Sequence, residues 1–541
     1  MRSNTNQLKK RLLAVALAVV TIATMNAQNG LNDNDIAVAN LKRGIELSDN
    51  IFNKMFRKQT GRLSFYYDIA TKSQKDVVSV WEYTAAFETV NSVLEGLEEV
   101  KEAEPELYAE THDRYVQLLS DLYSGLGYYQ GAYTESAPLI SYTGPNAWSP
   151  VYGVHRASVK GNANVQGIEN VYDDQMWIIR EMVRAYNNTG DVQYLQTAEA
   201  LTAYVLDGWD CNLKANGEEY GGITWGPGYT SKHSCSNGPL ISPLVWLSEI
   251  YSTADNAEKE VTYYVLDKAG KREQVTRKKS EYYLDFAKKI FDWQYNTLRD
   301  ASTGVFWDAT WASTGTIEYR EIDGVKYRVH LDVGAPGGDK WTYNTGVMVS
   351  GAADIYRVTS EQDYLTKLQD LGDKAYKAFS ARTRISGKSY YQLRLNKNSS
   401  KGCNGSPWFN QVLERAFIAE TPFVSAANSY VEEEQKCLDY AYENFLKEGF
   451  LPVNLLAGWE GESEVNVQYA LSRASEYALI VKYTPSETAI KATETVKKNN
   501  DKVDVYTLDG RKVKSHVGRR QVKEGLPKGI YIVDGEKYTV Q

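Results

Sequence analysis

Apolar side chains recur at steps of three and four residues along most of the chain between Ile36 and Tyr483. This spacing is the signature of amphipathic α-helices. It predicts about twelve helices, at residues 36–57, 78–99, 106–127, 173–188, 192–207, 238–253, 279–297, 343–357, 361–380, 408–419, 423–446 and 466–482. Short turns join them, such as Thr189-Gly190-Asp191 between the fourth and the fifth helix. Neighbouring helices are therefore expected to form antiparallel hairpins.

Twelve helices in antiparallel pairs make six hairpins, which predicts an all-α fold of the (α/α)6 barrel type. In such a barrel the inner helices are buried on both flanks and the outer helices cover them. An α-solenoid and two separate helical bundles are the alternatives. No repeat of fixed period is evident in the sequence, which disfavours the solenoid.

Three segments interrupt the helices. Residues 261–265 and 272–277 alternate in polarity around a short turn and predict a β-hairpin. Residues 316–321 and 325–329 flank Asp323-Gly324, a stronger hairpin signal. Residues 128–172 form a long stretch rich in Gly, Ser, Tyr and Pro. A connection of that length in a compact domain is usually functional.

The two ends of the chain differ in character from the helical region. Residues 1–27 combine Lys9, Lys10 and Arg11 with a short apolar run and predict a signal peptide cleaved before Gln28. Export to the periplasm, the outer cell surface or the medium is expected, with no membrane span after cleavage. The predicted helical domain covers residues 28–484, a linker 485–501, and a small β module 502–541.

Composition limits the partners and cofactors. A net charge of −8 offers no basic surface for nucleic acid. The 13 Phe, 12 Trp and 40 Tyr suit sugar-binding surfaces, although a large helical core uses aromatic residues too. The four cysteines, whose spacing is not that of metal ligands, predict no metal site. These cysteines are Cys211, Cys235, Cys403 and Cys437. They are expected to be buried small apolar residues, with a Cys211–Cys235 disulfide as the alternative.

The sharpest local feature is Asp173-Asp174 at the start of the fourth predicted helix. Aspartates commonly cap helices, so capping is the plainest interpretation. The pair nevertheless follows the long loop and lies between Tyr172 and Trp177. A carboxylate near the free N–H groups of a helix start is held ionised, and its neighbour feels a like charge that raises its pKa. One ionised and one protonated carboxyl group is what glycoside hydrolysis requires.

The stretch NVYDDQMWIIREMVRAYNNTGDVQYLQTAEALTAYVLDGWD resembles glycoside hydrolase family 76, the endo-α-1,6-mannanases. Further matching segments follow the family's order at residues 81–83, 221–225, 236–240 and 341–346, and the similarity spans residues 36–484. The resemblance implies an (α/α)6 barrel and retaining hydrolysis of α-mannan without metal or cofactor. It makes Asp173 the nucleophile and Asp174 the general acid/base. The cleft-lining residues it implies are Trp81, Tyr172, Trp225, Asn237, Asp308, Trp341, Tyr343 and Asn344.

Two other functions stay open. The same barrel also hosts other glycosidases and lyases, and a surface protein could bind glycans without cleaving them. Both hairpin insertions look longer than a minimal family member needs, which leaves the preferred mannan open. At the C-terminus, VDVYTLDGRKV followed by LPKGIYIVDGEKYTV resembles the sorting domains of type IX secretion and implies contact with that machinery. An accessory β module without that role is the alternative.

Overall fold

The computed structural model describes residues 33–483 except 135–141, 144–146, 268–269, 312–318, 330–332 and 397–401. It also describes residues 502–507, 512–518, 522, 526–527, 529–533 and 536–540. The expected signal peptide and linker lie outside these residues. The chain divides into a compact unit of residues 37–483 and a second unit that contains residues 484–541.

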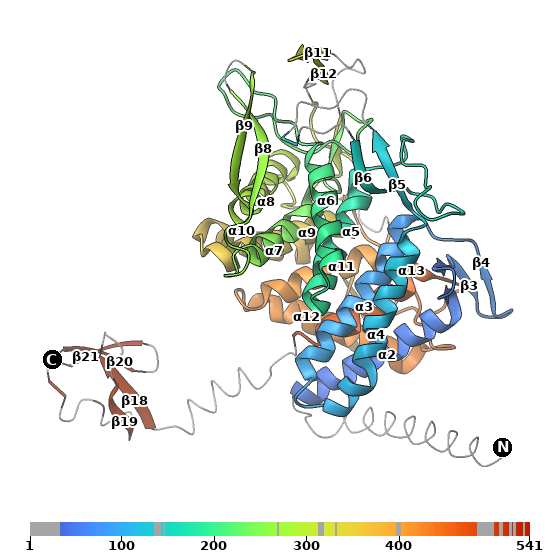
Figure 1. The fold of residues 1–541 in the computed structure, drawn as a ribbon. Helices are drawn as coiled ribbons and strands as arrows, with labels where there is room; N and C mark the ends of the chain where they lie inside the picture. Colours follow the sequence, from blue (N-terminus) through green and yellow to red (C-terminus); the bar gives the residue numbers. More distant parts are fainter. Residues whose placement is uncertain are drawn as a thin grey trace. The chain divides into compact units, whose positions relative to one another are not determined.

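The described residues form twelve α-helices, close to the ranges expected from periodicity (Figure 1). They are α2 (Asp33–Met55), α3 (Val80–Val100), α4 (Pro105–Leu126), α5 (Tyr172–Thr189), α6 (Val192–Leu206), α7 (Ile241–Ile250), α8 (Lys279–Leu298), α9 (Thr342–Thr359), α10 (Gln362–Phe379), α11 (Pro407–Glu420), α12 (Ala426–Phe445) and α13 (Val467–Ile480). The sixth expected helix begins later than predicted, because residues 238–240 form a short 3-10 helix, η1, ahead of α7. None of the helices described combines the length and apolarity that a membrane crossing requires.

The odd-numbered helices pack against one another in a closed cycle. Helix α3 contacts α5, α5 contacts α7, α7 contacts α9, α9 contacts α11, α11 contacts α13, and α13 returns to α3. Each also packs against a neighbour in the chain, as α5 does against α6 and α9 against α10. Helices α9 and α11 approach closely at Gly346, where a Cβ would lie 2.8 Å from the carbonyl oxygen of Val412. The closed cycle is the arrangement expected for the inner ring of helices.

Short antiparallel β-elements lie between the helices. Both predicted hairpins are present, as β8 (Glu260–Leu266) with β9 (Arg272–Lys278) and β11 (Tyr319–Ile322) with β12 (Val325–Arg328), although residues 316–318 fall outside the described ones. Two further pairs were not predicted: β5 (Gln130–Thr134) with β6 (Ala147–Tyr152), and β14 (Ser380–Ile385) with β15 (Lys388–Leu393). Ser386-Gly387 turns β14 into β15 with positive φ at both residues, the pattern of a tight hairpin turn.

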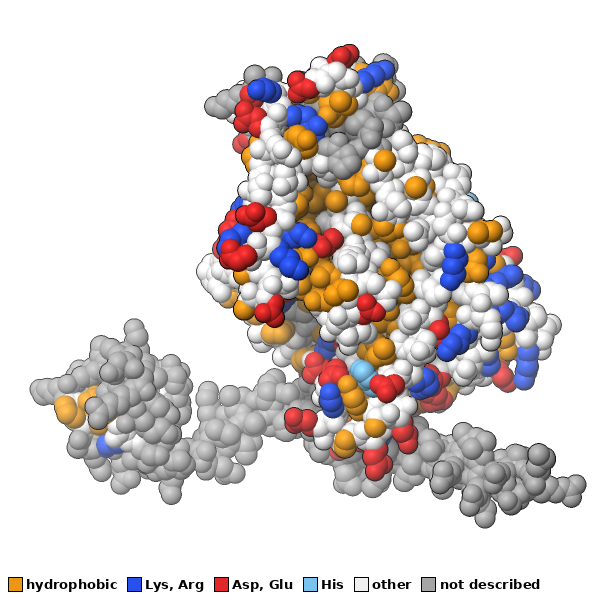
Figure 2. All heavy atoms as spheres, viewed as in Figure 1, with side chains coloured by type: hydrophobic (Ala, Val, Ile, Leu, Met, Phe, Trp, Pro, Cys, Tyr) orange, Lys and Arg blue, Asp and Glu red, His pale blue; other side chains and the backbone are white. Residues whose placement is uncertain are grey.

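The remaining short strands complete the edges of the helical unit. β1 (Phe56–Arg57) pairs with β2 (Arg62–Leu63), and β3 (Tyr66–Asp68) lies between β4 (Ser73–Lys75) and β17 (Glu464–Asn466). β7 (Lys232–His233) pairs with β10 (Ala309–Thr310), and β13 (Lys340–Trp341) runs parallel to β16 (Cys403–Asn404). On the face in Figure 2, acidic and basic side chains of the helical unit are interspersed around a central apolar area.

The C-terminal unit contains a four-stranded antiparallel sheet in the order β19-β18-β20-β21. Its strands are β18 (Lys502–Thr507), β19 (Lys512–Gly518), β20 (Gly529–Val533) and β21 (Glu536–Val540). They match the predicted β module. A small apolar core of Val505, Val522, Tyr531 and Val533 holds the sheet together.

Candidate active site

The starts of the inner helices meet at one end of the helical unit. The ring of Trp177, in α5, lies 4.8 Å from that of Trp408 at the start of α11, edge to face. Trp408 in turn packs against Trp81 at the start of α3, with centroids 5.5 Å apart. Tyr343 at the start of α9 contacts Phe409 of α11, with centroids 4.3 Å apart. The positive ends of these helix dipoles therefore converge on the same region.

Helix α5 presents both aspartates in its first turn. Its N-cap residue is Val171, which has no side-chain acceptor, so the first N–H groups of the helix are left to other partners. The backbone N–H of Tyr172 donates to the carbonyl oxygen of Trp225, 2.8 Å away, and fixes the helix start against the loop after α6. Asp173 keeps part of its side chain exposed, whereas Asp174 is buried.

The two carboxyl groups differ in their electrostatic surroundings. Burial raises the pKa of Asp173 to about 6, and the Cys235 thiol, the first backbone N–H groups of α5 and the Trp225 indole act in the opposite direction. Burial, then Asp173 and Glu82, raise the pKa of Asp174 well above its usual value. As the sequence predicts, Asp174 is the group that stays protonated and Asp173 the one that ionises more readily. The pKa of Asp173 is nevertheless higher than expected, because desolvation outweighs the helix N–H groups.

Three buried polar atoms near Asp173 have no hydrogen-bond partner among the described residues. They are Oδ1 of Asp173, Nε1 of Trp225 and Oδ1 of Asn344. Asn344 Nδ2 donates to Asp308 Oδ1, 3.4 Å away, which connects that carboxyl group to the same region. Burial raises the pKa of Tyr343, and Cys235, Asp308 and Asp173 act in the same direction, so Tyr343 lies near both carboxyl groups. Unsatisfied buried polar groups are uncommon in proteins, and a bound ligand is one way of satisfying them.

The structure therefore brings Trp225, Asp308, Tyr343 and Asn344 together around Asp173. Trp81 and Trp341 lie at the starts of α3 and α9 and share Phe409 as a neighbour, with centroids 6.1 and 5.4 Å away. Because the ring of Trp81 is half-buried and nearly parallel to Phe409, at 28°, only part of it is free to contact a ligand. Asn344 is fully buried and acts through Asp308.

Two predicted cleft residues have other roles. Tyr172 is 2 % exposed and packs edge to face on Tyr204, with centroids 5.1 Å apart, so it has no free ring face. Asn237 is fully buried, and its amide accepts from the backbone N–H of Ile223 at 2.7 Å and donates to the carbonyl oxygen of His233 at 2.7 Å. Asn237 thus holds the loop before α7 in place, and its contact with a sugar, like that of Tyr172, stays a prediction.

Other contributors did not stand out in the sequence. Cys235 faces Asp173, and all four cysteines are free thiols, so the Cys211–Cys235 bridge is not formed. His233 lies on Trp225, and burial lowers its pKa to about 4. Glu82, in the first turn of the neighbouring helix α3, forms a capping box with Ser79 and adds to the effect of burial and Asp173 in raising the pKa of Asp174. The only sequence signal for Glu82 was its position within residues 81–83, one of the segments that resemble family 76.

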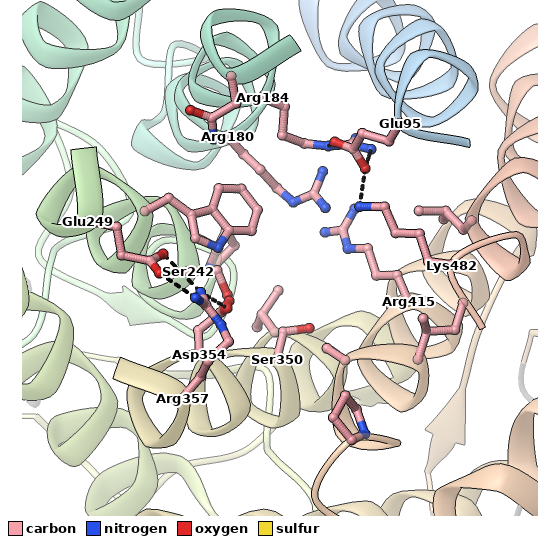
Figure 3. Close-up of a pocket in the computed structure, with 18 of the residues that line it drawn as sticks. Glu95, Arg180, Arg184, Ser242, Glu249, Ser350, Asp354, Arg357, Arg415 and Lys482 are labelled. Atoms are coloured by element: carbon pink, nitrogen blue, oxygen red, sulfur yellow. Dashed lines mark hydrogen bonds and ion pairs between the residues drawn. The ribbon is translucent and has the colours of Figure 1, made fainter. Parts of the chain in front are cut away.

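Neither of two cavities among the described residues is lined by the aspartates. One of about 430 Å³ is lined by Glu82 together with Phe65, Val77, Val78, Ser79, His155 and Arg156. Another of about 660 Å³ (Figure 3) lies further along the inner helices. There Arg184 pairs with Glu95 at 2.7 Å and Arg357 with Asp354 at 2.9 Å.

Comparison with known proteins identifies the family. Residues 158–262 and 273–429 match the model of glycosyl hydrolase family 76. These residues belong to glycosyl hydrolase family 76. The break between the two matched stretches, residues 263–272, falls inside the β8–β9 hairpin.

Curated relatives include two fungal mannan endo-1,6-α-mannosidases. DCW1 of Saccharomyces cerevisiae is 24% identical over 204 residues, 37% of this chain and 36% of its own. DFG5 of Candida albicans is 22% identical over 258 residues, 47% of this chain and 44% of its own. The matched part thus spans less than half of the length of either relative.

Solved family 76 structures share the fold. Those from a bovine strain of Bacteroides thetaiotaomicron and from strain VPI-5482 have TM-scores of 0.59 and 0.58 at 18% and 19% identity. Each match covers 82% of this chain, and 77% and 98% of the respective structure. An α-1,6-mannanase of Salegentibacter sp. HEL1_6 has a TM-score of 0.52 at 18% identity, covering 83% of this chain and 99% of that one.

Proposed function

We propose that this protein is an exported glycoside hydrolase that cleaves α-1,6-mannosidic bonds of mannan with retention of configuration. The observation that carries the proposal is the aspartate pair with separated pKa values beside three unsatisfied buried polar atoms. A sugar has the hydroxyl groups that would satisfy those atoms. The Salegentibacter mannanase was solved as an inactive variant in which two consecutive aspartates are asparagine, in complex with α-1,6-mannotriose.

The proposed reaction proceeds in two displacements. Asp173, ionised above its pKa of about 6, attacks the anomeric carbon of a mannose, and Asp174, protonated at neutral pH, gives its proton to the leaving glycosidic oxygen. A covalent glycosyl-enzyme results. Asp174, now ionised, takes a proton from water, which attacks the anomeric carbon and releases Asp173. If the two roles were exchanged, the nucleophile would be Asp174, which is protonated at neutral pH. We therefore assign the attack to Asp173.

The closed cycle of α3, α5, α7, α9, α11 and α13 supports the (α/α)6 barrel as the scaffold. In that scaffold the helix starts form one rim. The aspartates lie on that rim with Trp225, Tyr343 and Asp308 around them, and Trp81 and Trp341 further along it. This arrangement places aromatic rings beside carboxyl groups, the chemistry that recognises neutral sugars.

The deciding experiment compares Asp173→Asn, Asp174→Asn and Asp191→Asn on linear α-1,6-mannan. Asp191 is the N-cap of α6, accepting from Gln193 N at 3.0 Å, and asparagine caps equally well, so this variant controls for an Asp→Asn change at a helix start. The first two variants should lose about 10³-fold or more in kcat, and the control none. Equal activity in all four proteins would refute the catalytic assignment.

Product analysis tests the substrate and the stereochemistry. Proton NMR during the first minutes should show the α-anomer appearing before the β-anomer. First appearance of the β-anomer would mean inversion. Tight binding of mannan without product would favour a glycan-binding protein, and turnover of another polysaccharide in a panel would favour a different glycosidase.

For the ends of the chain, we propose that residues 1–27 direct export and that the sheet of residues 502–541 serves as a type IX sorting domain. The tail sequence with its Lys-Gly-Ile-Tyr step supports this role. N-terminal sequencing of secreted protein should give Gln28 as the first residue. Deleting residues 502–541 should leave the enzyme in the periplasm of a host that has the pathway, and secretion of the truncated protein would refute the proposal.

A further inference from the structure

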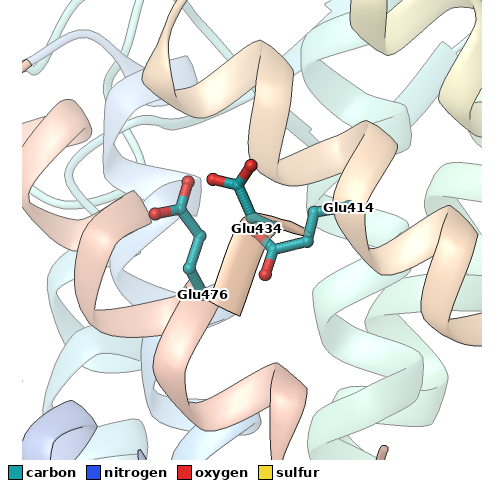
Figure 4. Close-up of side chains that lie close together, drawn as sticks. All are labelled: Glu414, Glu434 and Glu476. Carbon is teal, nitrogen blue, oxygen red and sulfur yellow. The ribbon is translucent and has the colours of Figure 1, made fainter. Parts of the chain in front are cut away.

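Three glutamates from three different helices meet in the interior of the helical unit. Glu414 lies on α11, Glu434 on α12 and Glu476 on α13 (Figure 4). One carboxylate oxygen of each lies within 4.8 Å of those of the other two. The residues are 2 %, 7 % and 0 % exposed, so water has little access to them.

The neighbourhood supplies one positive charge. Arg473 donates to both carboxylate oxygens of Glu476, at 2.7 and 2.6 Å, and to the carbonyl oxygen of Val453 at 2.7 Å. It also acts on Glu434 and Glu414 at longer range. Three ionised carboxylates against one guanidinium would leave two negative charges, and uncompensated buried charge is strongly unfavourable. Without a bound cation, burial and the neighbouring carboxylates raise the pKa of Glu414 and raise that of Glu434 to about 8, so the cluster takes up protons unless a cation replaces them.

Glu414 provides a separate observation. Both of its carboxylate oxygens are buried and have no hydrogen-bond partner among the described residues. An unpartnered carboxylate at 2 % exposure is unusual, because buried polar groups are nearly always satisfied. A proton on Glu414 would remove its charge and supply one donor, but its carbonyl oxygen would still have no donor among the described residues.

We propose that Glu414, Glu434 and Glu476 bind one Ca²⁺ ion, which links α11, α12 and α13. A divalent cation cancels the two excess negative charges. Three carboxylates offer up to six hard oxygen ligands, the set that Ca²⁺ prefers. Ligands on opposite sides of a Ca²⁺ ion are about 4.6–5.2 Å apart, so oxygens within 4.8 Å of one another fit around one ion. Mg²⁺ fits less well, because it retains several waters.

The site would be structural and independent of the proposed hydrolysis. Glu434 comes from α12, whereas Glu414 and Glu476 come from helices of the inner cycle, so the ion would tie one covering helix to two inner ones. None of the three residues is among those placed around Asp173. Binding is expected to occur as the chain folds, because the three carboxyl groups are buried.

The test uses the full-length protein, unfolded in chelator and refolded with excess chelator, with CaCl2 or with MgCl2. Element analysis after gel filtration should find one Ca²⁺ per chain. At 100 times the Kd, Ca²⁺ should increase the folding equilibrium constant about 100-fold and raise the Tm accordingly. An equal effect of MgCl2, or no retained metal and no change in Tm, would overturn the proposal.

Substitutions test whether these glutamates hold the Ca²⁺ ion. Glu434→Gln and, as a second choice if the first folds poorly, Glu414→Gln should abolish Ca²⁺ retention and the rise in Tm. Glu443→Gln is the matched control, since Glu443 lies exposed on the same helix α12 and should leave both unchanged. Calcium bound equally by all variants would show that it lies elsewhere. A wild-type Tm that is independent of Ca²⁺ but rises on acidification would show that the carboxyl groups carry protons instead.

Discussion

The imidazole ring of His233 lies nearly flat on the indole ring of Trp225, with centroids 4.5 Å apart and planes at 22°. Tyr229 packs on the same indole with a centroid distance of 4.6 Å. These contacts fix the orientation of Trp225. Its Nε1 makes no hydrogen bond of ordinary length among the described residues, but the indole lies close enough to Asp173 to lower the pKa of that carboxyl group. A rigid aromatic residue with an N–H donor beside Asp173 is suited to hold a sugar at the reacting position.

Trp225→Phe should weaken productive binding of mannan. The change removes the Nε1–H donor and part of the ring. Because one hydrogen bond to the sugar would be lost, kcat/KM should fall about 5- to 10-fold. Trp246→Phe is the control, because Trp246 lines the cavity further along the inner helices and should change kcat/KM less than about twofold. Similar losses in both variants would argue against a sugar contact at Trp225.

The rate should depend on pH through both aspartates. Asp173 has to be ionised to attack, and its pKa is raised to about 6 by burial, so kcat/KM should fall as the pH drops below that value. Asp174 has to be protonated, and burial with the charges of Asp173 and Glu82 raises its pKa, so activity should persist through neutral pH and decline in base. Initial rates from pH 4 to 9 would reveal the two limbs. A rate that stays flat down to pH 4 would contradict the assignment of Asp173.

Cys235→Ala should move the acid limb to higher pH. The thiol of Cys235 lowers the pKa of Asp173 against the larger effect of burial, so its removal leaves the carboxylate less stabilised. Cys437→Ala, another buried free thiol, is the control and should leave the limb in place. The measurement is the pH dependence of kcat/KM for the three proteins. An unchanged limb in Cys235→Ala would mean that the thiol does not act on Asp173.

Asp174→Asn should stabilise the fold while it removes activity. The pKa of Asp174 is raised in the folded state, so the folded protein binds this proton more tightly than the unfolded chain. Wild-type stability is therefore lost as the pH rises from the unfolded pKa toward the folded one, whereas an amide has no such dependence. Calorimetry should show that the Tm of Asp174→Asn exceeds that of the wild type. This difference should be small at pH 4 and grow toward pH 8. A difference that shrinks with rising pH would contradict the raised pKa.

The local elements could be read from the sequence because their signals are local. Three- and four-residue periodicity fixes which face of a helix is apolar, and this predicted all twelve described helices. The β14–β15 hairpin was missed although Ser386-Gly387 is a known turn signal; its residues lie between the helices predicted to end at 380 and to begin at 408, and were assigned no element. The β5–β6 pair was missed because its two strands are joined by a longer connection without a tight-turn signal.

The placement of Asp173-Asp174 in the first turn of α5 follows from the sequence alone, because a helix start is set by its own residues. Which side chains surround the pair was decided only by tertiary structure. Cys235 and Glu82 come from two distant segments, and their effects on the pKa values of Asp173 and Asp174 depend on distance and burial that no local pattern encodes. The same holds for Glu414, Glu434 and Glu476, which look like ordinary helix-surface residues until three helices pack and remove the solvent around them.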